Sequence, residues 1–169
     1  VGTHSAHNYY GMEWFLTEVW PKILIENPLC TLKAAGSIKN RFKGMYFKNV
    51  DFIGSVPSLT DEYAGAQLCI VPLPAGSGLK IKLVEALAHG KACVSTSAGL
   101  QGLFEAEGRA VIKADSSGDF CGAVCDVLKN KDKRQRMEKE AVRFRDEYFS
   151  PEKAYADLTD CLKRRLNYE

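Results

Sequence analysis

Short runs of apolar and β-branched residues alternate along this chain with longer segments in which apolar residues recur every three or four positions. The short runs are typical of buried strands, and the longer segments are typical of amphipathic helices. Strands that alternate with helices form βα units on a parallel sheet. We therefore expect an α/β fold, with a parallel sheet of about six strands flanked by helices. The expected strands are residues 1–2, 30–36, 50–54, 67–72, 92–96 and 110–114.

Helix start signals lie between the expected strands. Asn8 is a good N-cap for a first helix that runs to about Asn27, with a kink or a restart at Pro21. A serine that is followed three residues later by an aspartate, or directly by a proline, marks the start of each of three later helices. These three serines are Ser58, Ser116 and Ser150.

The chain is expected to form one domain, with the sheet in residues 1–115 and only helices in residues 116–169. Its 169 residues, 46% of them apolar, suffice to bury one core. Val1 and Gly2 resemble the last step of a strand whose earlier part is absent, so we expect a fragment of a longer protein. The expected C-terminal helices are 117–130, 132–148 and 151–166.

Charge and cysteine content narrow the possible functions. A formal net charge of +2 gives nucleic-acid binding no electrostatic support, and the basic run 129–139 also contains acids, which is typical of a solvated helix face. No apolar run approaches the roughly 20 residues that a bilayer requires. The six cysteines form no C-x-x-C pair, so we expect reduced thiols in the core of a cytoplasmic protein, and no metal site.

The stretch AGSGLKIKLVEALAHG, residues 75–90, combines a glycine turn with an apolar helical pattern that contains charges. On a helix over residues 78–89, one narrow stripe holds Gly78, Lys82, Glu85 and His89. Apolar residues occupy nearly all the remaining surface. This pattern predicts a helix that is buried on almost every side, with one polar line that faces a polar partner.

This helix follows a strand, so its start is expected at the carboxyl edge of the sheet, where open α/β folds bind ligands. Backbone N–H groups, the helix dipole and the ammonium groups of Lys80 and Lys82 converge there, which favours a phosphate. Glu85, one turn further, is placed to accept two hydrogen bonds from a ribose. The glycine spacing matches neither the Walker loop nor the dinucleotide-binding fingerprint.

A purely structural interpretation of the same charges stays open. Lys82 and Glu85 are three residues apart and are able to form an ordinary ion pair on a half-exposed helix face. His89, next to Gly90, is a favourable residue for a helix C-terminus.

Three segments, in order, resemble the same domain of one known family. VPLPAGSGLKIKLVEALAHGKACVSTSAGLQGL, residues 71–103, resembles the donor-site segment of retaining GT-B glycosyltransferases, of the glycosyl transferases group 1 or family 4 type. VGTHSAHNYYGMEWFLTEVWP and NVDFIGSVPSLTDEYAGAQLCIVP are similar to the preceding parts of that domain. The resemblance covers residues 1–115, and EYFSPEKAYADL extends it loosely into the C-terminal helices.

This resemblance implies a Rossmann-like, nucleotide-sugar-binding half of a two-domain enzyme whose other half shapes the acceptor site. It implies that Glu85 holds the donor ribose, as the second glutamate of the family's E-x7-E motif. It also implies that Lys80 and Lys82 are the catalytic cations beside the diphosphate, and that backbone near Val56 contacts the base. The implied donor is a UDP-, GDP- or ADP-sugar, bound without a metal or a cofactor.

Two positions depart from the family pattern. Ser77 stands where the first glutamate of E-x7-E is expected, so its contact with the donor sugar is weakened or is made by another group. The arginine and lysine that often follow the glycine of the first strand are absent, since Thr3 follows Gly2 and Asn8 lies near the lysine's place. The expected donor-binding residues are therefore Glu85, Ser77, Gly76, Gly78, Gly2, Thr3, Asn8 and Val56.

We therefore expect a cytoplasmic domain of a hexosyltransferase that acts with retention and without a metal, and that is inactive alone. The acceptor stays open, and any membrane contact would involve the missing half. The alternatives are an epimerase or hydrolase of nucleotide sugars, and a non-catalytic nucleotide-sugar-binding module, which Ser77 favours. A flavodoxin-like signalling domain is disfavoured because no acidic cluster follows a strand.

Overall fold

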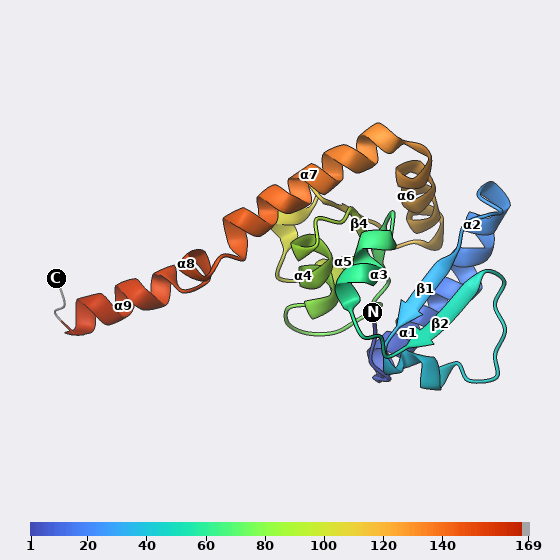
Figure 1. The fold of residues 1–169 in the computed structure, drawn as a ribbon, viewed down its shortest axis with the longest axis horizontal. Helices are drawn as coiled ribbons and strands as arrows, with labels where there is room; N and C mark the ends of the chain where they lie inside the picture. Colours follow the sequence, from blue (N-terminus) through green and yellow to red (C-terminus); the bar gives the residue numbers. More distant parts are fainter. Residues whose placement is uncertain (167–169) are drawn as a thin grey trace.

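The computed structural model describes residues 1–166, with the side chains of all but Pro151, Ala154 and Asp157. The described chain is an α/β fold with parallel strands in two sheets and helices around them (Figure 1). In the first sheet, β1 (Leu32–Ala35) pairs with β2 (Val50–Gly54). In the second, the order is β3 (Cys69–Val71), β4 (Cys93–Ser95), β5 (Val111–Lys113).

The strand count is five in the described residues, against about six predicted. The prediction of a strand at residues 1–2 is wrong for this structure, because a single pair of backbone hydrogen bonds at Gly2 does not form a strand ladder. Its N–H donates to the Ala35 carbonyl at 2.9 Å, and its carbonyl accepts from the Ile38 N–H at 3.0 Å. The other five strands lie within the predicted ranges but are mostly shorter, since only their central residues face a neighbouring strand.

The first helical segment differs from its prediction at its start and at its centre. It comprises α1 (Ala6–Trp14), the π-helix η1 (Phe15–Val19) and α2 (Trp20–Glu26). Ser5, not Asn8, is the N-cap, because the Ser5 side chain accepts from the Asn8 N–H. The wide π turn precedes Pro21, which has no N–H to donate to the preceding turn.

Two predicted capping signals are confirmed. Ser58 accepts from the N–H of Asp61 at the start of α3 (Leu59–Gly65), and Ser116 does the same for Asp119 at the start of α6 (Ser117–Lys129). Short elements complete the body between the strands. They are η2 (Ser37–Arg41), α4 (Ile81–Ala88), α5 (Ser97–Leu100) and η3 (Phe104–Ala106).

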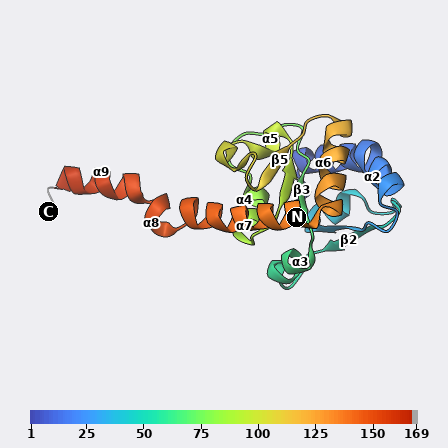
Figure 2. The same ribbon diagram turned by 90° about the horizontal axis from the view of Figure 1, so that it is seen from above.

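The C-terminal part is helical, as predicted. It consists of α7 (Lys131–Tyr148), α8 (Pro151–Ala154) and α9 (Ala156–Leu166), so the single helix predicted over 151–166 is interrupted at Tyr155. Figures 1 and 2 both show α8 and α9 projecting away from the body. Residues 167–169 of the predicted helical region lie outside the described residues. No helix within residues 1–166 combines the length and apolarity that crossing a membrane requires.

Two apolar clusters lie on opposite faces of the second sheet. One surrounds Phe15 and Phe120, whose rings meet edge to face with centroids 5.7 Å apart, and the other joins residues of α4 and α7. On β4, Val94 belongs to the first cluster and Cys93 to the second, because successive strand residues face opposite sides. The predicted burial of the cysteines holds for Cys93 but not for Cys161, which is exposed on α9.

A close backbone contact joins α1 to the segment that follows β3. Gly11 is the buried residue of α1, and a Cβ added to it would lie 2.1 Å from the carbonyl oxygen of Pro72. Real carbon and oxygen atoms do not approach so closely, so only glycine permits this packing. The contact fixes the second turn of α1 against the loop that leads to α4.

We predict that Gly11→Ala lowers the free energy of unfolding by about 2 kcal/mol or more, because the added methyl group must push the two backbones apart. The matched control is Gly122→Ala, since Gly122 also lies in a helix but has open space around its Cα. That control is expected to gain up to about 1 kcal/mol from helix propensity alone. Urea denaturation measures both changes, and equal stabilities of the two variants would contradict the close contact.

Candidate functional site

The segment between β3 and α4 forms the turn on which the candidate site is built. Gly76 and Gly78 have φ values of +141° and +69°, a region that favours glycine. Lys80 then takes an extended conformation and stands at the N-cap position of α4. The helix predicted over 78–89 therefore begins three residues later than expected, because the left-handed Gly78 cannot be part of an α-helix.

The helix α4 is amphipathic and not buried on almost every side, which corrects the sequence prediction. Leu83, Ala86 and Leu87 are fully buried in the second apolar cluster. Ile81 is 63% exposed, and Leu79 of the preceding turn is 50% exposed. The exposed apolar side chains lie at the start of α4, beside the pocket described next.

A pocket of about 510 Å³ lies at the start of α4, at the carboxyl edge of the second sheet. It brings together all the predicted site residues except Gly78 and Val56, which are not among its lining residues. Val56 lies in the loop after β2. The predicted residues that line the pocket are Gly2, Thr3, Asn8, Gly76, Ser77, Lys80, Lys82 and Glu85.

Lys80 is folded over the glycine turn. Its side chain is nearly buried, and its Nζ donates to the carbonyl oxygens of Ser77 at 3.1 Å and Gly78 at 2.6 Å. A longer contact of 3.4 Å reaches Oε1 of Gln101. The ammonium group thus neutralises the carbonyl side of the turn, directly beside the first N–H groups of α4.

Lys82 connects α4 to α1. Its Nζ donates to Oδ1 of Asn8, and the Asn8 amide in turn donates to Oγ1 and to the carbonyl of Thr3. The pKa of Lys82 is lowered to about 8, chiefly by burial; the charge of Glu85 raises this pKa, and the charge of Lys80 lowers it. A lysine with such a pKa gains from an anionic ligand, because the ligand would stabilise its charged form.

Glu85 is held by a residue of α3 and does not form the expected ion pair with Lys82. The hydroxyl of Tyr63, on α3, donates to Oε2 of Glu85 at 3.3 Å, and the Tyr63 ring stacks on His89 with ring centroids 4.6 Å apart. Burial first, and the charge of Glu85 second, raise the pKa of Tyr63, so its hydroxyl keeps its proton. Since Lys82 bonds to Asn8 instead, Lys82 and Glu85 are separate polar groups of one pocket.

Three residues near the site were missed by the sequence analysis. His7 lines the pocket, Gln101 contacts Lys80, and Tyr63 contacts Glu85. For His7, its position directly before the predicted site residue Asn8 was the one sequence signal that could have placed it at the site. Tyr63 and Gln101 come from segments whose position relative to α4 depends on tertiary packing.

The pocket contains only one carboxylate, that of Glu85, among its lining residues. The described residues contain one group of possible metal ligands, Glu26, Cys121 and Cys125, at the contact between α2 and α6. These groups have protein partners, since Glu26 pairs with Lys129 at 2.6 Å and Cys125 accepts from Asn27 at 3.2 Å. The candidate site is therefore suited to bind an anion and hydroxyl groups. Its two lysines and single carboxylate are poorly suited to bind a cation.

Comparisons with known proteins assign the chain to a family. The profile of the family described as "Glycosyl transferases group 1" matches residues 1–130. An "Uncharacterized 44.6 kDa protein in cps region" of Klebsiella pneumoniae is 26% identical over 162 residues, which cover 90% of this chain. The chain spans 42% of the length of that relative.

The depressed pKa of Lys82 predicts a pH effect on stability. Between pH 8 and the ordinary lysine pKa of about 10.5, the unfolded chain binds this proton and the folded chain does not, so the free energy of unfolding rises with pH. Relative to Lys82→Met, the wild type should gain about 1 kcal/mol from pH 8 to pH 10, since solvent screens part of the effect. Urea denaturation across this range measures the difference in the free energy of unfolding between the wild type and each variant. For the control Lys131→Met, this difference should stay constant with pH. A constant difference for Lys82→Met would contradict the burial of the Lys82 charge.

Proposed function

This chain belongs to the family Glycosyl transferases group 1, and we propose that its pocket binds the nucleoside diphosphate part of a nucleotide-sugar donor. The longer enzyme would transfer the sugar from that donor to an acceptor, with retention of configuration. The observation that carries this proposal is the convergence of Lys80, Lys82 and Glu85 on one pocket at the start of α4. Because the chain spans 42% of the length of its relative, the activity and the acceptor of the whole protein are part of the proposal.

The diphosphate is proposed to lie against the glycine turn and the first turn of α4. The unpaired N–H groups and the dipole at a helix start attract an anion, and two ammonium groups add to that field. Lys80 would exchange the carbonyls of Ser77 and Gly78 for phosphate oxygens. Lys82 would keep its position through Asn8, and the phosphate would stabilise its protonated form.

Glu85 is proposed to hold the ribose, one helical turn further from the phosphate. Its two carboxylate oxygens are able to accept hydrogen bonds from the two ribose hydroxyls, while Tyr63 keeps the side chain in place. A phosphate at the turn and a ribose at Glu85 match the order of groups in a nucleoside diphosphate.

The proposed chemistry needs stabilisation of the leaving group. The bond between the anomeric carbon and the diphosphate oxygen breaks, and the electron pair leaves with the diphosphate. The acceptor oxygen forms the new bond, and its proton passes to the departing diphosphate oxygen. Lys80 and Lys82 would neutralise the negative charge that develops on the diphosphate, as fixed charges do in a preorganised site. The single carboxylate of the pocket supports a reaction without a metal.

Two other functions remain as alternatives. An epimerase or hydrolase of nucleotide sugars would use the same diphosphate site, and analysis of products with and without an acceptor separates it from a transferase. A non-catalytic module would bind the nucleotide without turnover, and Ser77, in place of the first glutamate of the motif, is the residue that favours it. The cytoplasm remains the predicted compartment, and membrane contact is proposed only for the other half of the enzyme.

We predict that the full-length protein binds one of UDP, GDP and ADP in a saturable manner, and that Glu85→Gln weakens this binding about tenfold or more. The physical reason is the loss of a charged acceptor for the ribose hydroxyls. Isothermal titration calorimetry measures the affinities, with Glu105→Gln as the control, since Glu105 is exposed on η3. Unchanged affinity of Glu85→Gln would contradict the ribose role, and no binding of any of the three would contradict the donor site.

We predict that Lys80→Met in the full-length enzyme lowers kcat/KM by about 100-fold or more, because one fixed positive charge beside the leaving group is lost. Steady-state kinetics with the donor identified by titration measures this effect. Lys131→Met, at the exposed start of α7, is the matched control and should leave kcat/KM unchanged. A Lys80→Met enzyme with wild-type kcat/KM would show that Lys80 takes no part in the reaction.

A further inference from the structure

His7 is an ionisable residue of the pocket at the start of α4 that has no role in the proposed function. It is the second residue of α1, and its side chain is exposed. The His4 ring, three residues earlier, has Nδ1 at 3.4 Å from Oγ of Ser37. The His7 ring has no such hydrogen bond and no ion pair within the described residues. Its ring nitrogens are therefore available to a ligand in the pocket.

The space between His7 and Lys80 is open because Gly76 has no side chain. A Cβ added to Gly76 would lie 3.9 Å from Cδ2 of His7 and 3.6 Å from Nζ of Lys80. The imidazole of α1 and the ammonium group of the turn thus border one small volume. The φ of +141° at Gly76 disfavours a side chain there, so this volume is left for a ligand atom that contacts both groups.

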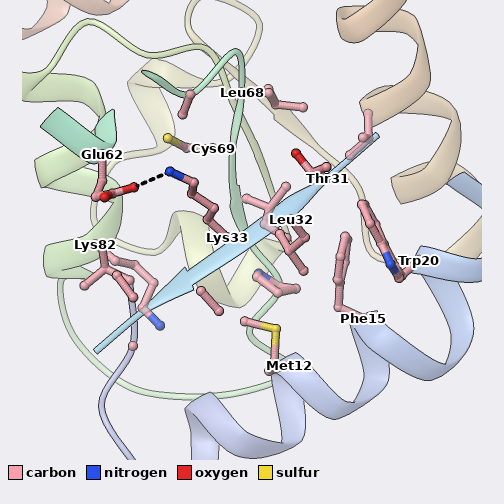
Figure 3. Close-up of a pocket in the computed structure, with 18 of the residues that line it drawn as sticks. Met12, Phe15, Trp20, Thr31, Leu32, Lys33, Glu62, Leu68, Cys69 and Lys82 are labelled. Atoms are coloured by element: carbon pink, nitrogen blue, oxygen red, sulfur yellow. Dashed lines mark hydrogen bonds and ion pairs between the residues drawn. The ribbon is translucent and has the colours of Figure 1, made fainter. Parts of the chain in front are cut away.

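Lys82 occupies the other side of the pocket. Its Nζ donates to Oδ1 of Asn8, and both residues also line a cavity of about 520 Å³ beside β1 and β3. Figure 3 shows this cavity, with Lys82 at the end to which β1 points. Of the two cavities, His7 lines only the pocket at the start of α4. His7 and Lys80 are therefore the pair beside the glycine turn, where the diphosphate is proposed to lie.

The cationic surroundings of His7 favour an anion. Lys80 from the turn and Lys82 from α4 line the same pocket. Arg41 of η2 donates to the carbonyl of His4, close to the start of α1. His7 is itself in the first turn of α1, so the positive end of a second helix dipole adds to that of α4.

The carboxylates near His7 have other partners. Glu85 lines the pocket from α4 and accepts from the hydroxyl of Tyr63. Glu13, on α1 itself, accepts from the hydroxyl of Tyr9 at 2.5 Å. Neither carboxylate pairs with the His7 ring in the described residues. A protonated imidazole in this place would therefore be stabilised by an anion that is bound from solution.

We propose that His7 is a third cation of the donor site, whose protonated ring binds the diphosphate together with Lys80, so that donor binding weakens as the pH rises. This inference rests on the proposed function, since it assigns one more group to the same diphosphate. A protonated imidazole donates from both ring nitrogens and carries a full charge. Because an imidazole changes its charge between pH 5 and 8, His7 would make the site sensitive to pH in the neutral range.

In the proposed transfer, His7 would stabilise charge and would not exchange a proton. As the bond between the anomeric carbon and the diphosphate oxygen breaks, negative charge develops on the diphosphate. A charged N–H of the His7 ring would form a stronger hydrogen bond to a phosphate oxygen at this stage. The proton that the departing oxygen takes up comes from the acceptor, so His7 keeps its own proton.

The pH dependence of ligand affinity in the full-length protein tests this role. The ligands are the methyl esters of UDP, GDP and ADP on the β-phosphate, because a diphosphate that is esterified at both ends keeps its charge at neutral pH. For the wild type, the affinity for the ester that binds should fall about five- to tenfold from pH 6 to pH 7.5, as an imidazole loses its proton. Isothermal titration calorimetry measures this fall. Lys82, with a pKa of about 8, contributes equally to the wild type and to variants of His7.

Two substitutions separate the charge of His7 from its shape. His7→Lys should abolish the fall in affinity, because a lysine ammonium keeps its charge over this pH range. His7→Gln should also abolish the fall, and at pH 6 it should bind the ester about fivefold more weakly than the wild type or worse. The matched control is His4→Gln, since His4 contacts Ser37 and is not among the lining residues of the pocket, and it should keep the wild-type fall.

A wild-type affinity that stays constant from pH 6 to pH 7.5 would overturn the role of His7 and leave the donor site in place. The same conclusion would follow if either His7 variant kept the wild-type fall in affinity. If the wild type bound none of the three esters and none of UDP, GDP and ADP, the proposed function would be overturned, and this inference with it.

Discussion

The candidate site depends on one backbone contact, between Gly11 of α1 and the carbonyl of Pro72 after β3. The absence of a side chain at Gly11 brings α1 against the loop that leads to α4. Asn8, about one turn earlier on α1, then lies within reach of Lys82, although the two residues are far apart in the sequence. Asn8 of α1 and Lys82 of α4 thus meet in one pocket because the backbones at Gly11 and Pro72 are in contact.

The electrostatics of the pocket favour an anionic ligand. Lys80 and Lys82 lie near each other at the positive end of a helix, and each has found neutral oxygen partners, a carbonyl pair for Lys80 and an amide for Lys82. The pKa of Lys82 is lowered, because burial and Lys80 both oppose its charge. An anion bound between them would stabilise the charged form of both lysines. The chain belongs to the family Glycosyl transferases group 1, and the diphosphate of the proposed donor is an anion of the required kind.

Much of the fold and of the site could be predicted from the sequence, because local signals decide these features. The capping serines at Ser58 and Ser116 and five strands within their predicted ranges are confirmed, and most predicted site residues line one pocket. The features that could not be predicted depend on competition between neighbouring capping residues or on tertiary packing. Ser5 replaces Asn8 as the N-cap because the Asn8 amide bonds to Thr3, and the left-handed Gly78 delays the start of α4. No sequence signal indicates that Tyr63, on another helix, holds Glu85.

The most direct measurement is a crystal structure of the full-length protein with the nucleoside diphosphate that it binds. The predicted result is a diphosphate at the glycine turn, with phosphate oxygens within hydrogen-bond distance of Nζ of Lys80 and of the first N–H groups of α4, and with the ribose hydroxyls on Glu85. Electron density for the diphosphate at any other position, with Lys80 still bonded to the carbonyls of Ser77 and Gly78, would contradict the proposed donor site.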